Sequence, residues 1–215
     1  MGRRRAAGPQ GGNRGRTGAM PEGGAVRPCG LAVLLVSMSV GASGAEVAGI
    51  TLADRTTLGT SVLVLNGAGL KKKLFFKVYV AGLYLAEKRT SPAAVFALPG
   101  PKRVSITLMR DLPARKLVAA LSDDIYDNSS PEEQQALKGR VGDLAASLLA
   151  LRQGKKGDVI TFDWLPDAGT LVALNGDVQG SPIPGADFYH ALLSVWLGDR
   201  PASDGLKRAL LGRRD

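Results

Sequence analysis

In the middle of the chain, hydrophobic residues follow the two-residue period that is typical of β-strands. The period is most regular in residues 103–110, where Val104, Ile106 and Leu108 fall on one side and mostly polar residues on the other, as in a half-buried strand. Residues 74–85 are instead mostly apolar, β-branched or aromatic, which favours a strand covered on both faces. The pattern also predicts short strands at 47–54 and 61–65 and turns at 55–60 and 66–69.

Farther along the chain the period changes to the three- or four-residue spacing of helices. The clearest helix start is at Ser130, which can cap a helix, with Pro131 at the first helical position and Glu133 three residues after the cap. The apolar stripe of this helix continues to Leu151, and Gly154 is placed to end it. Three other segments carry apolar residues at helical spacing: 114–126, 187–197 and 204–211.

Strands are predicted again between these helices, at residues 159–164 and 170–174. Asn175 and Gly176 form the dipeptide that is typical of a two-residue type I′ hairpin turn, which leads toward Val178. The predicted order is therefore strands, two helices, more strands and two helices. Strands and helices in separate runs indicate an α+β domain, in which helices cover one face of an antiparallel sheet.

Residues 1–24 are rich in Gly and Arg and nearly free of large apolar side chains. Such a segment cannot bury enough surface to offset its chain entropy, so we predict that it is disordered. Residues 25–45 have the layout of a signal peptide: Arg27, an apolar run at 31–40, and small residues up to Ala45. Because the apolar run is much shorter than the ~20 residues of a spanning helix, we predict cleavage after Ala45, no stable membrane span, and a periplasmic or secreted protein.

Met20 is an alternative start, since residues 20–45 alone have ordinary signal-peptide proportions. Residues 1–45 contain six arginines and one glutamate, so their removal lowers the formal net charge from +9 to +4. In this mildly basic remainder no Lys/Arg run alternates with stacking aromatics, and we expect no nucleic-acid partner. Cys29 also leaves with the signal peptide, so the mature chain has neither a disulfide nor a Cys metal ligand.

No pattern for a cofactor or a metal ion is present. A single histidine, His190, and no mature cysteine leave no spacing typical of a transition-metal site. Gly67 and Gly69 precede a strand instead of a helix, which is the wrong context for a nucleotide phosphate, so we interpret them as part of a tight turn. His190 is interpreted as a packed or surface residue. We therefore predict that the protein uses no cofactor.

The strongest candidate site lies in residues 66–85, where lysines and tyrosines interrupt an apolar strand. If side chains alternate strictly, Lys71, Lys73 and Tyr79 share one face, although one β-bulge would exchange the faces. If this face borders a cleft between sheet and helices, Lys71 or Lys73 and the Tyr79 hydroxyl would bind a carboxylate or phenolate there. Arg110, at the end of the neighbouring strand, would be a further ligand-binding residue. The alternative is structural, because lysines at a sheet edge discourage aggregation.

Two separated motifs resemble the chalcone isomerase-like proteins, specifically their exported bacterial branch. The motifs are NGAGLKKKLFFKVYVAGLYL at residues 66–85 and VWLGDRPASDGLKRALLG at residues 195–212. The resemblance extends over residues 46–212, which we take as one chalcone isomerase-like domain. It implies an open-faced β-sandwich, in which a long curved antiparallel sheet is backed by helices.

The resemblance does not decide the function, because the family includes enzymes that cyclise chalcones, fatty-acid-binding members and members without known catalysis. In the enzymes an arginine two residues after the Gly-Ala-Gly turn holds the substrate anion, and the resemblance places Lys71 there. The enzymes' threonine on the following strand corresponds to Tyr79. Their tyrosine and asparagine on the next helix fall within residues 114–121, where neither residue type occurs.

These departures favour a non-catalytic binder of small amphipathic acids such as fatty acids. The first alternative is an isomerase (intramolecular lyase) for an unknown chalcone-like or enone substrate, in which Lys71 stabilises an anionic oxygen. The second alternative is a structural or interaction protein of the cell envelope. A small amphipathic acid or phenolic molecule is the expected partner in the first two cases.

Overall fold

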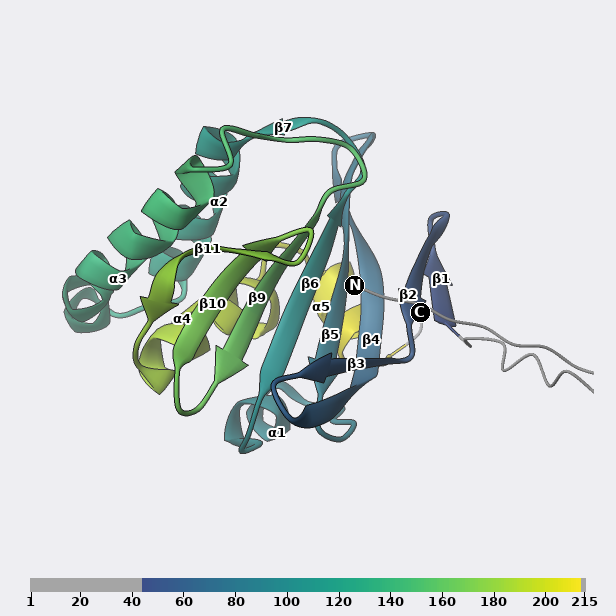
Figure 1. Ribbon diagram of the computed structural model, residues 1–215, viewed down its shortest axis with the longest axis horizontal. Helices are drawn as coiled ribbons and strands as arrows, with labels where there is room; N and C mark the ends of the chain where they lie inside the picture. Colours follow the sequence, from purple (N-terminus) through teal and green to yellow (C-terminus); the bar gives the residue numbers. More distant parts are fainter. Residues whose placement is uncertain (1–43, 214–215) are drawn as a thin grey trace, which may run out of the picture. The chain divides into compact units, whose positions relative to one another are not determined.

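The computed structural model describes residues 44–213, which form a curled antiparallel sheet with helices on one face (Figure 1). The main sheet has seven strands in the order β11-β10-β9-β6-β5-β4-β3. Two small sheets, β1–β2 and β7–β8, flank it. This is the predicted α+β architecture. The predictions for residues 1–24, and for the signal peptide up to residue 43, lie outside the described residues.

The main sheet consists of β3 (Arg55–Leu58), β4 (Ser61–Lys73), β5 (Phe76–Leu85), β6 (Lys102–Leu108), β9 (Val159–Leu165), β10 (Gly169–Leu174) and β11 (Asp177–Ile183). The small sheets consist of β1 (Gly44–Val47), β2 (Ile50–Ala53), β7 (Leu112–Pro113) and β8 (Gln153–Gly154). The helices are α1 (Pro92–Ala97), α2 (Ala114–Asp127), α3 (Pro131–Leu149), α4 (Ala186–Leu197) and α5 (Asp204–Leu210).

The predicted helices are present because their sequence signals are local. At the start of α3 the Ser130 hydroxyl accepts from the Glu133 backbone N–H (3.3 Å), and the Glu133 carboxylate accepts from the Ser130 N–H (2.8 Å). The predicted end of α3 was wrong. The helix stops at Leu149, and Gly154 lies in β8, where an added Cβ would be 2.4 Å from the Leu108 side chain.

The hydrophobic core lies between the sheet and the helices. Val104, Ile106 and Leu108 of β6 are almost fully buried in it, as their alternation predicted. The largest side chains on this side come from β9 and α4: Phe162, Phe188 and Trp196. Helix α3 contacts β10 and β11, α4 contacts β10, and α5 contacts β4 and β5, so the helices lie against both halves of the sheet (Figure 1).

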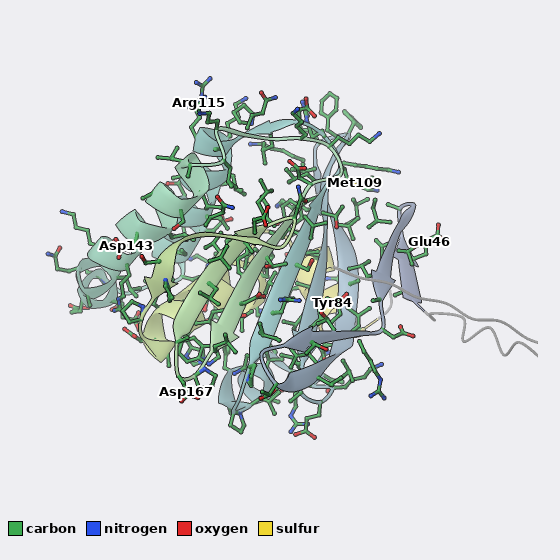
Figure 2. All side chains as sticks on the ribbon, in the orientation of Figure 1. Glu46, Tyr84, Met109, Arg115, Asp143 and Asp167 are labelled. Carbon is green, nitrogen blue, oxygen red and sulfur yellow. The ribbon has the colours of Figure 1, made fainter. Side chains whose placement is uncertain are left out.

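The opposite face of the sheet carries a smaller apolar cluster under the β1–β2 hairpin. Tyr84, labelled in Figure 2, belongs to it, and Leu52 of β2 packs where a side chain at Gly82 would lie. Beside Tyr84, the Arg103 guanidinium forms a bidentate ion pair with Asp163, with both N–O distances 2.6 Å. In this ion pair the two largely buried charges neutralise each other.

The turn predicted at 55–60 is shorter, at residues 59–60, because residues 55–58 form strand β3. The turn predicted at 66–69 was wrong, since these residues lie within the continuous strand β4, whose hairpin turn with β5 is at Leu74 and Phe75. The glycines at 67 and 69 serve close packing instead. An added Cβ would lie 2.1 Å from the Ala209 carbonyl oxygen at Gly67, and 2.7 Å from the Ala209 Cβ at Gly69. The two glycines therefore allow the backbone of α5 to lie directly on β4.

Other differences from the prediction are small. The strand predicted at 47–54 is divided into β1 and β2 by a turn at Ala48 and Gly49, both with positive φ. Helix α1 was not predicted, although Ser91 caps it by accepting from the Ala94 N–H (3.3 Å) and Pro92 begins it. Its six residues are too few for a hydrophobic period to be recognised.

Candidate ligand-binding site

Lys71 and Tyr79 lie opposite each other on the adjacent strands β4 and β5. Directly paired residues in an antiparallel sheet place their side chains on the same face, and here it is the face that the helices cover. The sequence placed the two residues on one face of a single strand. The structure keeps their shared face but assigns them to two strands, joined by the turn at 74–75 and offset by a bulge after Lys71.

Tyr79 is buried in the core, and its hydroxyl oxygen accepts a hydrogen bond from the indole N–H of Trp196 on α4 (3.1 Å). Burial raises the pKa of the Tyr79 phenol to about 12, an effect that the Trp196 hydrogen bond opposes and the Asp124 carboxylate reinforces. The phenol is therefore protonated at neutral pH. It can donate or accept a hydrogen bond, but it is not a base.

Lys71 is half-buried where β4 meets the loop between α4 and α5. Its ammonium donates to the Ala202 backbone carbonyl in that loop. Burial lowers the pKa of Lys71, which the nearby Asp124 carboxylate opposes and Lys73 reinforces. Among the described residues this ammonium forms no ion pair within 4.0 Å. Its hydrogen-bond acceptor is thus a neutral carbonyl, although a carboxylate would bind an ammonium more strongly.

Asp124 supplies the negative charge of this cluster from α2. Burial raises the pKa of Asp124, while Lys71 lowers it. Next to it, Asn128 ties the end of α2 to the α4–α5 loop. The Asn128 amide donates to the carbonyls of Asp124 and Arg200 (both 2.8 Å) and accepts from the Arg200 N–H (2.9 Å). Asn128 therefore has a structural role.

The sequence did not identify Asp124, Trp196 or Ala202 as neighbours of the two candidates. A weak signal existed for Asp124, which lies three residues after Leu121 and so at the edge of the apolar stripe of α2. Nothing comparable marks Trp196 or Ala202, because their proximity to Lys71 and Tyr79 depends on how α4 and its loop pack on the sheet.

Lys73 and Arg110 do not join this cluster. Lys73 is exposed at the end of β4. Arg110 is exposed after the end of β6, and its guanidinium carbon lies 5.2 Å from the centre of the Phe76 ring, in a cation–π contact. Of the four predicted residues, Lys71 and Tyr79 therefore lie together. The other two, Lys73 and Arg110, are exposed cations farther out at the same end of the sheet.

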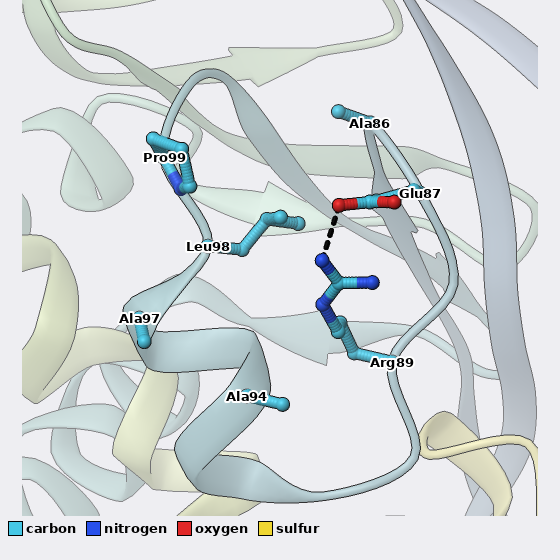
Figure 3. Close-up of a pocket in the computed structure, with 7 residues that line it drawn as sticks. All are labelled: Ala86, Glu87, Arg89, Ala94, Ala97, Leu98 and Pro99. Carbon is cyan, nitrogen blue, oxygen red and sulfur yellow. Dashed lines mark hydrogen bonds and ion pairs between the residues drawn. The ribbon is translucent and has the colours of Figure 1, made fainter.

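Two surface pockets lie near α1, and neither Lys71 nor Tyr79 lines them. An open pocket of about 500 Å³ is found between the β5–α1 loop and the segment after α1, where Arg89 pairs with Glu87 (Figure 3). A smaller pocket of about 250 Å³ includes Phe96, Asn128 and His190. The His190 ring packs edge-on against Phe96 with ring centres 4.4 Å apart, and burial lowers the pKa of the imidazole. His190 is exposed and packs on Phe96, which agrees with its interpretation as a packed or surface residue.

Within residues 44–213, no group of three or more His, Cys, Asp or Glu side chains is placed to hold a metal ion. No helix in this part of the chain is long and apolar enough to cross a membrane. The chemistry that the Lys71 cluster offers is therefore that of a half-buried cation beside a protonated phenol at the margin of a large apolar core. Such a site can hold an anion and can donate hydrogen bonds.

Comparisons with known proteins agree with this fold. Among solved structures, a fatty-acid-binding protein of Arabidopsis thaliana matches with a TM-score of 0.61 and 15% sequence identity, over 76% of this chain and 92% of the plant chain. No match was found among curated proteins. Residues 44–212 match the chalcone isomerase-like family, which is most of the chain. The chain therefore belongs to the chalcone isomerase-like family.

Proposed function

We propose that this protein binds small amphipathic acids such as fatty acids, without catalysis, and that Lys71 holds the carboxylate. The observation that carries the proposal is the half-buried Lys71 ammonium, which borders the apolar core and, within residues 44–213, has only a neutral carbonyl as hydrogen-bond acceptor. The fold is compatible with this function, since the plant protein of similar structure is a fatty-acid-binding protein.

In the proposed complex the ligand carboxylate replaces the Ala202 carbonyl as the acceptor for Lys71. The exchange is favourable because a carboxylate adds the attraction between two opposite charges, which the neutral carbonyl does not supply. A carboxylate beside Lys71 also counters the desolvation that lowers the lysine pKa. The apolar tail then lies between the sheet and the helices, so binding requires the α4–α5 loop to move away from β4.

Tyr79 supports binding rather than proton transfer. Its phenol, with a pKa of about 12, stays protonated at neutral pH and already pairs with Trp196. A general base must have a pKa near the working pH to be effective. Tyr79 therefore contributes to the apolar wall of the site and fixes the position of α4.

The proposal is tested by displacement of a fluorescent fatty acid from the purified protein, with native mass spectrometry to detect co-purified acids. In Lys71→Met we expect the dissociation constant to rise about 10- to 100-fold, which is the usual loss when a hydrogen bond to a charged group is removed. Lys73→Met removes the same charge two residues farther along β4, where the side chain is exposed, and should change binding less than twofold. Equal affinities in both variants would contradict the proposal.

We also propose that the protein belongs to an exported bacterial branch of its family and reaches the periplasm or the medium. The support is the basic, apolar and small-residue order of residues 25–45. Cleavage after Ala45 removes two of the four residues of β1 and leaves Glu46 and Val47. N-terminal sequencing of protein from cell fractions tests this: a new terminus at Glu46 supports it, and an intact terminus in the cytoplasm contradicts it.

A further inference from the structure

The turn of the β4–β5 hairpin exposes three consecutive apolar side chains. Leu74 is 83% exposed, Phe75 is 97% exposed and Phe76 is 60% exposed. Figure 2 shows that side chains project beyond this end of the sheet, above Met109. Single exposed apolar residues are common, but a run of three at the tip of a hairpin is unusual in a soluble domain and marks an interaction site.

The turn itself is built from residues that do not favour it. Leu74 and Phe75 form a two-residue loop between the paired residues Lys73 and Phe76, and Leu74 has a φ of 55°. Hairpin turns of this length usually place Gly, Asn or Asp where φ is positive, because a larger side chain is strained there. The chain therefore accepts backbone strain in order to keep a large apolar residue at the tip, which points to a functional reason.

A ring of cations surrounds this apolar tip. Lys72, Lys73 and Lys77 are exposed on the two strands, and Arg110 packs on the Phe76 ring. There is no acidic residue from position 66 to position 86. The nearest acid after Arg110 is Asp111, whose carboxylate accepts the Lys156 backbone N–H (2.9 Å). The tip thus combines exposed apolar surface with a positive charge that no nearby carboxylate of the hairpin offsets.

We propose that this tip, residues 72–77, docks the protein on a lipid bilayer that contains anionic lipids. Leu74 and Phe75 enter the boundary between headgroups and acyl chains, while Lys72, Lys73 and Lys77 contact the headgroup phosphates. Apolar residues at the point and lysines behind them match the order of layers at a membrane surface. A flat protein partner fits less well, because a two-residue point offers little area to a surface that cannot be penetrated.

Membrane docking by the tip does not require the fatty-acid binding proposed above, but the tip and Lys71 lie close together. Lys71 lies three residues before Leu74 on β4, about 10 Å from the tip at the rise of a β-strand. A docked hairpin would therefore hold the lysine close to the headgroup layer. Amphipathic acids dissolved in the bilayer present their carboxylates in that layer, so docking places the site at their source.

The first test measures the depth of the tip in vesicles. Full-length Phe75→Trp is mixed with vesicles of phosphatidylcholine and phosphatidylglycerol whose acyl chains are brominated, and the emission of wild type is subtracted. We expect a blue shift and quenching of the new tryptophan. Val178→Trp, at an apolar position that is 56% exposed on β11, is the matched control and should stay unquenched. This local readout separates docking by the tip from any binding by residues 1–43.

The second test measures how binding depends on the tip in a co-sedimentation assay with the same lipids, unbrominated. Leu74→Gly with Phe75→Asn gives a turn that favours the hairpin, and it should weaken binding at least tenfold. Lys72→Gln with Lys73→Gln should weaken binding about 30-fold, and only on vesicles with phosphatidylglycerol. Val178→Ser is the control and should change nothing. An unquenched Trp at position 75, or unchanged binding in both double variants, would overturn the proposal.

Discussion

The two halves of the β4–β5 hairpin belong to the same two strands but lie in different environments, and a bulge between Lys71 and Lys72 separates them. Toward the middle of the sheet, Ala81, Leu83 and Leu85 are fully buried, and α5 lies directly on Gly67 and Gly69. Beyond the Lys71–Tyr79 pair, residues 72–77 of the same hairpin are exposed. The same two strands thus pack against the rest of the domain at one end and are exposed to solvent at the other. Lys71 lies at the boundary between the two halves.

The two halves of the hairpin differ in whether other parts of the chain pack against them. In the buried half, Asn66 anchors the chain: its amide donates to the carbonyls of Arg89 (2.9 Å) and Leu210 (2.7 Å) and accepts from the Arg89 N–H (2.6 Å). In the outer half residues 72–77 are exposed, so apolar side chains there gain little from folding. We expect mutations to affect stability in the buried half and surface binding in the outer half.

The largest effect is expected from Gly67→Ala in the buried half. The new Cβ would lie 2.1 Å from the Ala209 carbonyl oxygen and 2.7 Å from that of Leu210, both backbone atoms that cannot rotate away. Either α5 moves or the strand bends, and we expect the free energy of unfolding to fall by about 3 kcal/mol. Urea denaturation monitored by circular dichroism measures this change.

Gly139→Ala on α3 is the matched control for that substitution. Apart from the neighbouring residues and the backbone of the helix itself, no described atom lies within 4 Å of the added Cβ, and the residue is exposed in the interior of a helix. Alanine is favoured over glycine there, so the protein should become more stable by up to about 1 kcal/mol. If Gly67→Ala were as harmless as Gly139→Ala, α5 would not be packed closely on β4.

A smaller effect is expected at the boundary, where Tyr79 couples stability to alkaline pH. A tyrosine titrates near pH 10 in the unfolded chain, but the folded-state pKa of Tyr79 is about 12. Between these values the unfolded state binds fewer protons than the folded state, so stability falls as pH rises. This tyrosine should account for a loss of about 2 kcal/mol by pH 11.5.

Urea denaturation of wild type and Tyr79→Phe between pH 8 and pH 11.5 measures this contribution. The variant loses the Trp196 hydrogen bond at every pH, so it should be less stable at pH 8 and should then lose less stability than wild type on going to pH 11.5. The comparison isolates Tyr79 because the other shifted groups, such as Tyr189 and Lys71, are present in both proteins. Parallel pH profiles would show that Tyr79 is not buried as described.

The smallest effect on stability is expected at the tip. Leu74→Gly with Phe75→Asn removes two exposed side chains and relieves the positive φ at Leu74. The free energy of unfolding should stay the same or rise by less than about 1 kcal/mol. A loss of more than that would mean that the tip packs against the domain, which would contradict the contrast between the two halves of the hairpin.

The prediction from sequence was accurate where the signal was local. The capping residues Ser130 and Glu133 and the alternation in β6 are properties of a few neighbouring residues, and both elements are present. The β4–β5 turn was misplaced because Gly67 and Gly69 have the composition of a turn, whereas Leu74 and Phe75 do not. The glycines are instead required by α5, about 140 residues later in the chain, and no local pattern contains that information.

The candidate site was predicted in part for the same reason. Lys71 and Tyr79 were recognised because charged and phenolic groups are unusual in an apolar strand, and the family motif includes both positions. Their partners Trp196 and Ala202 lie on elements that meet the strands only through tertiary packing. Their contacts could not be deduced from spacing along the chain.

The central claim is that Lys71 meets the carboxylate of an acidic ligand at the boundary of the buried half. The most direct measurement is carbon-13 NMR of a fatty acid labelled at its carboxyl carbon, titrated with acid while bound to wild type and to Lys71→Met. An ammonium nearby favours the charged carboxylate, so the carboxyl pKa of the bound acid should be lower in wild type than in Lys71→Met. The same bound signal and the same carboxyl pKa in both proteins would contradict the claim.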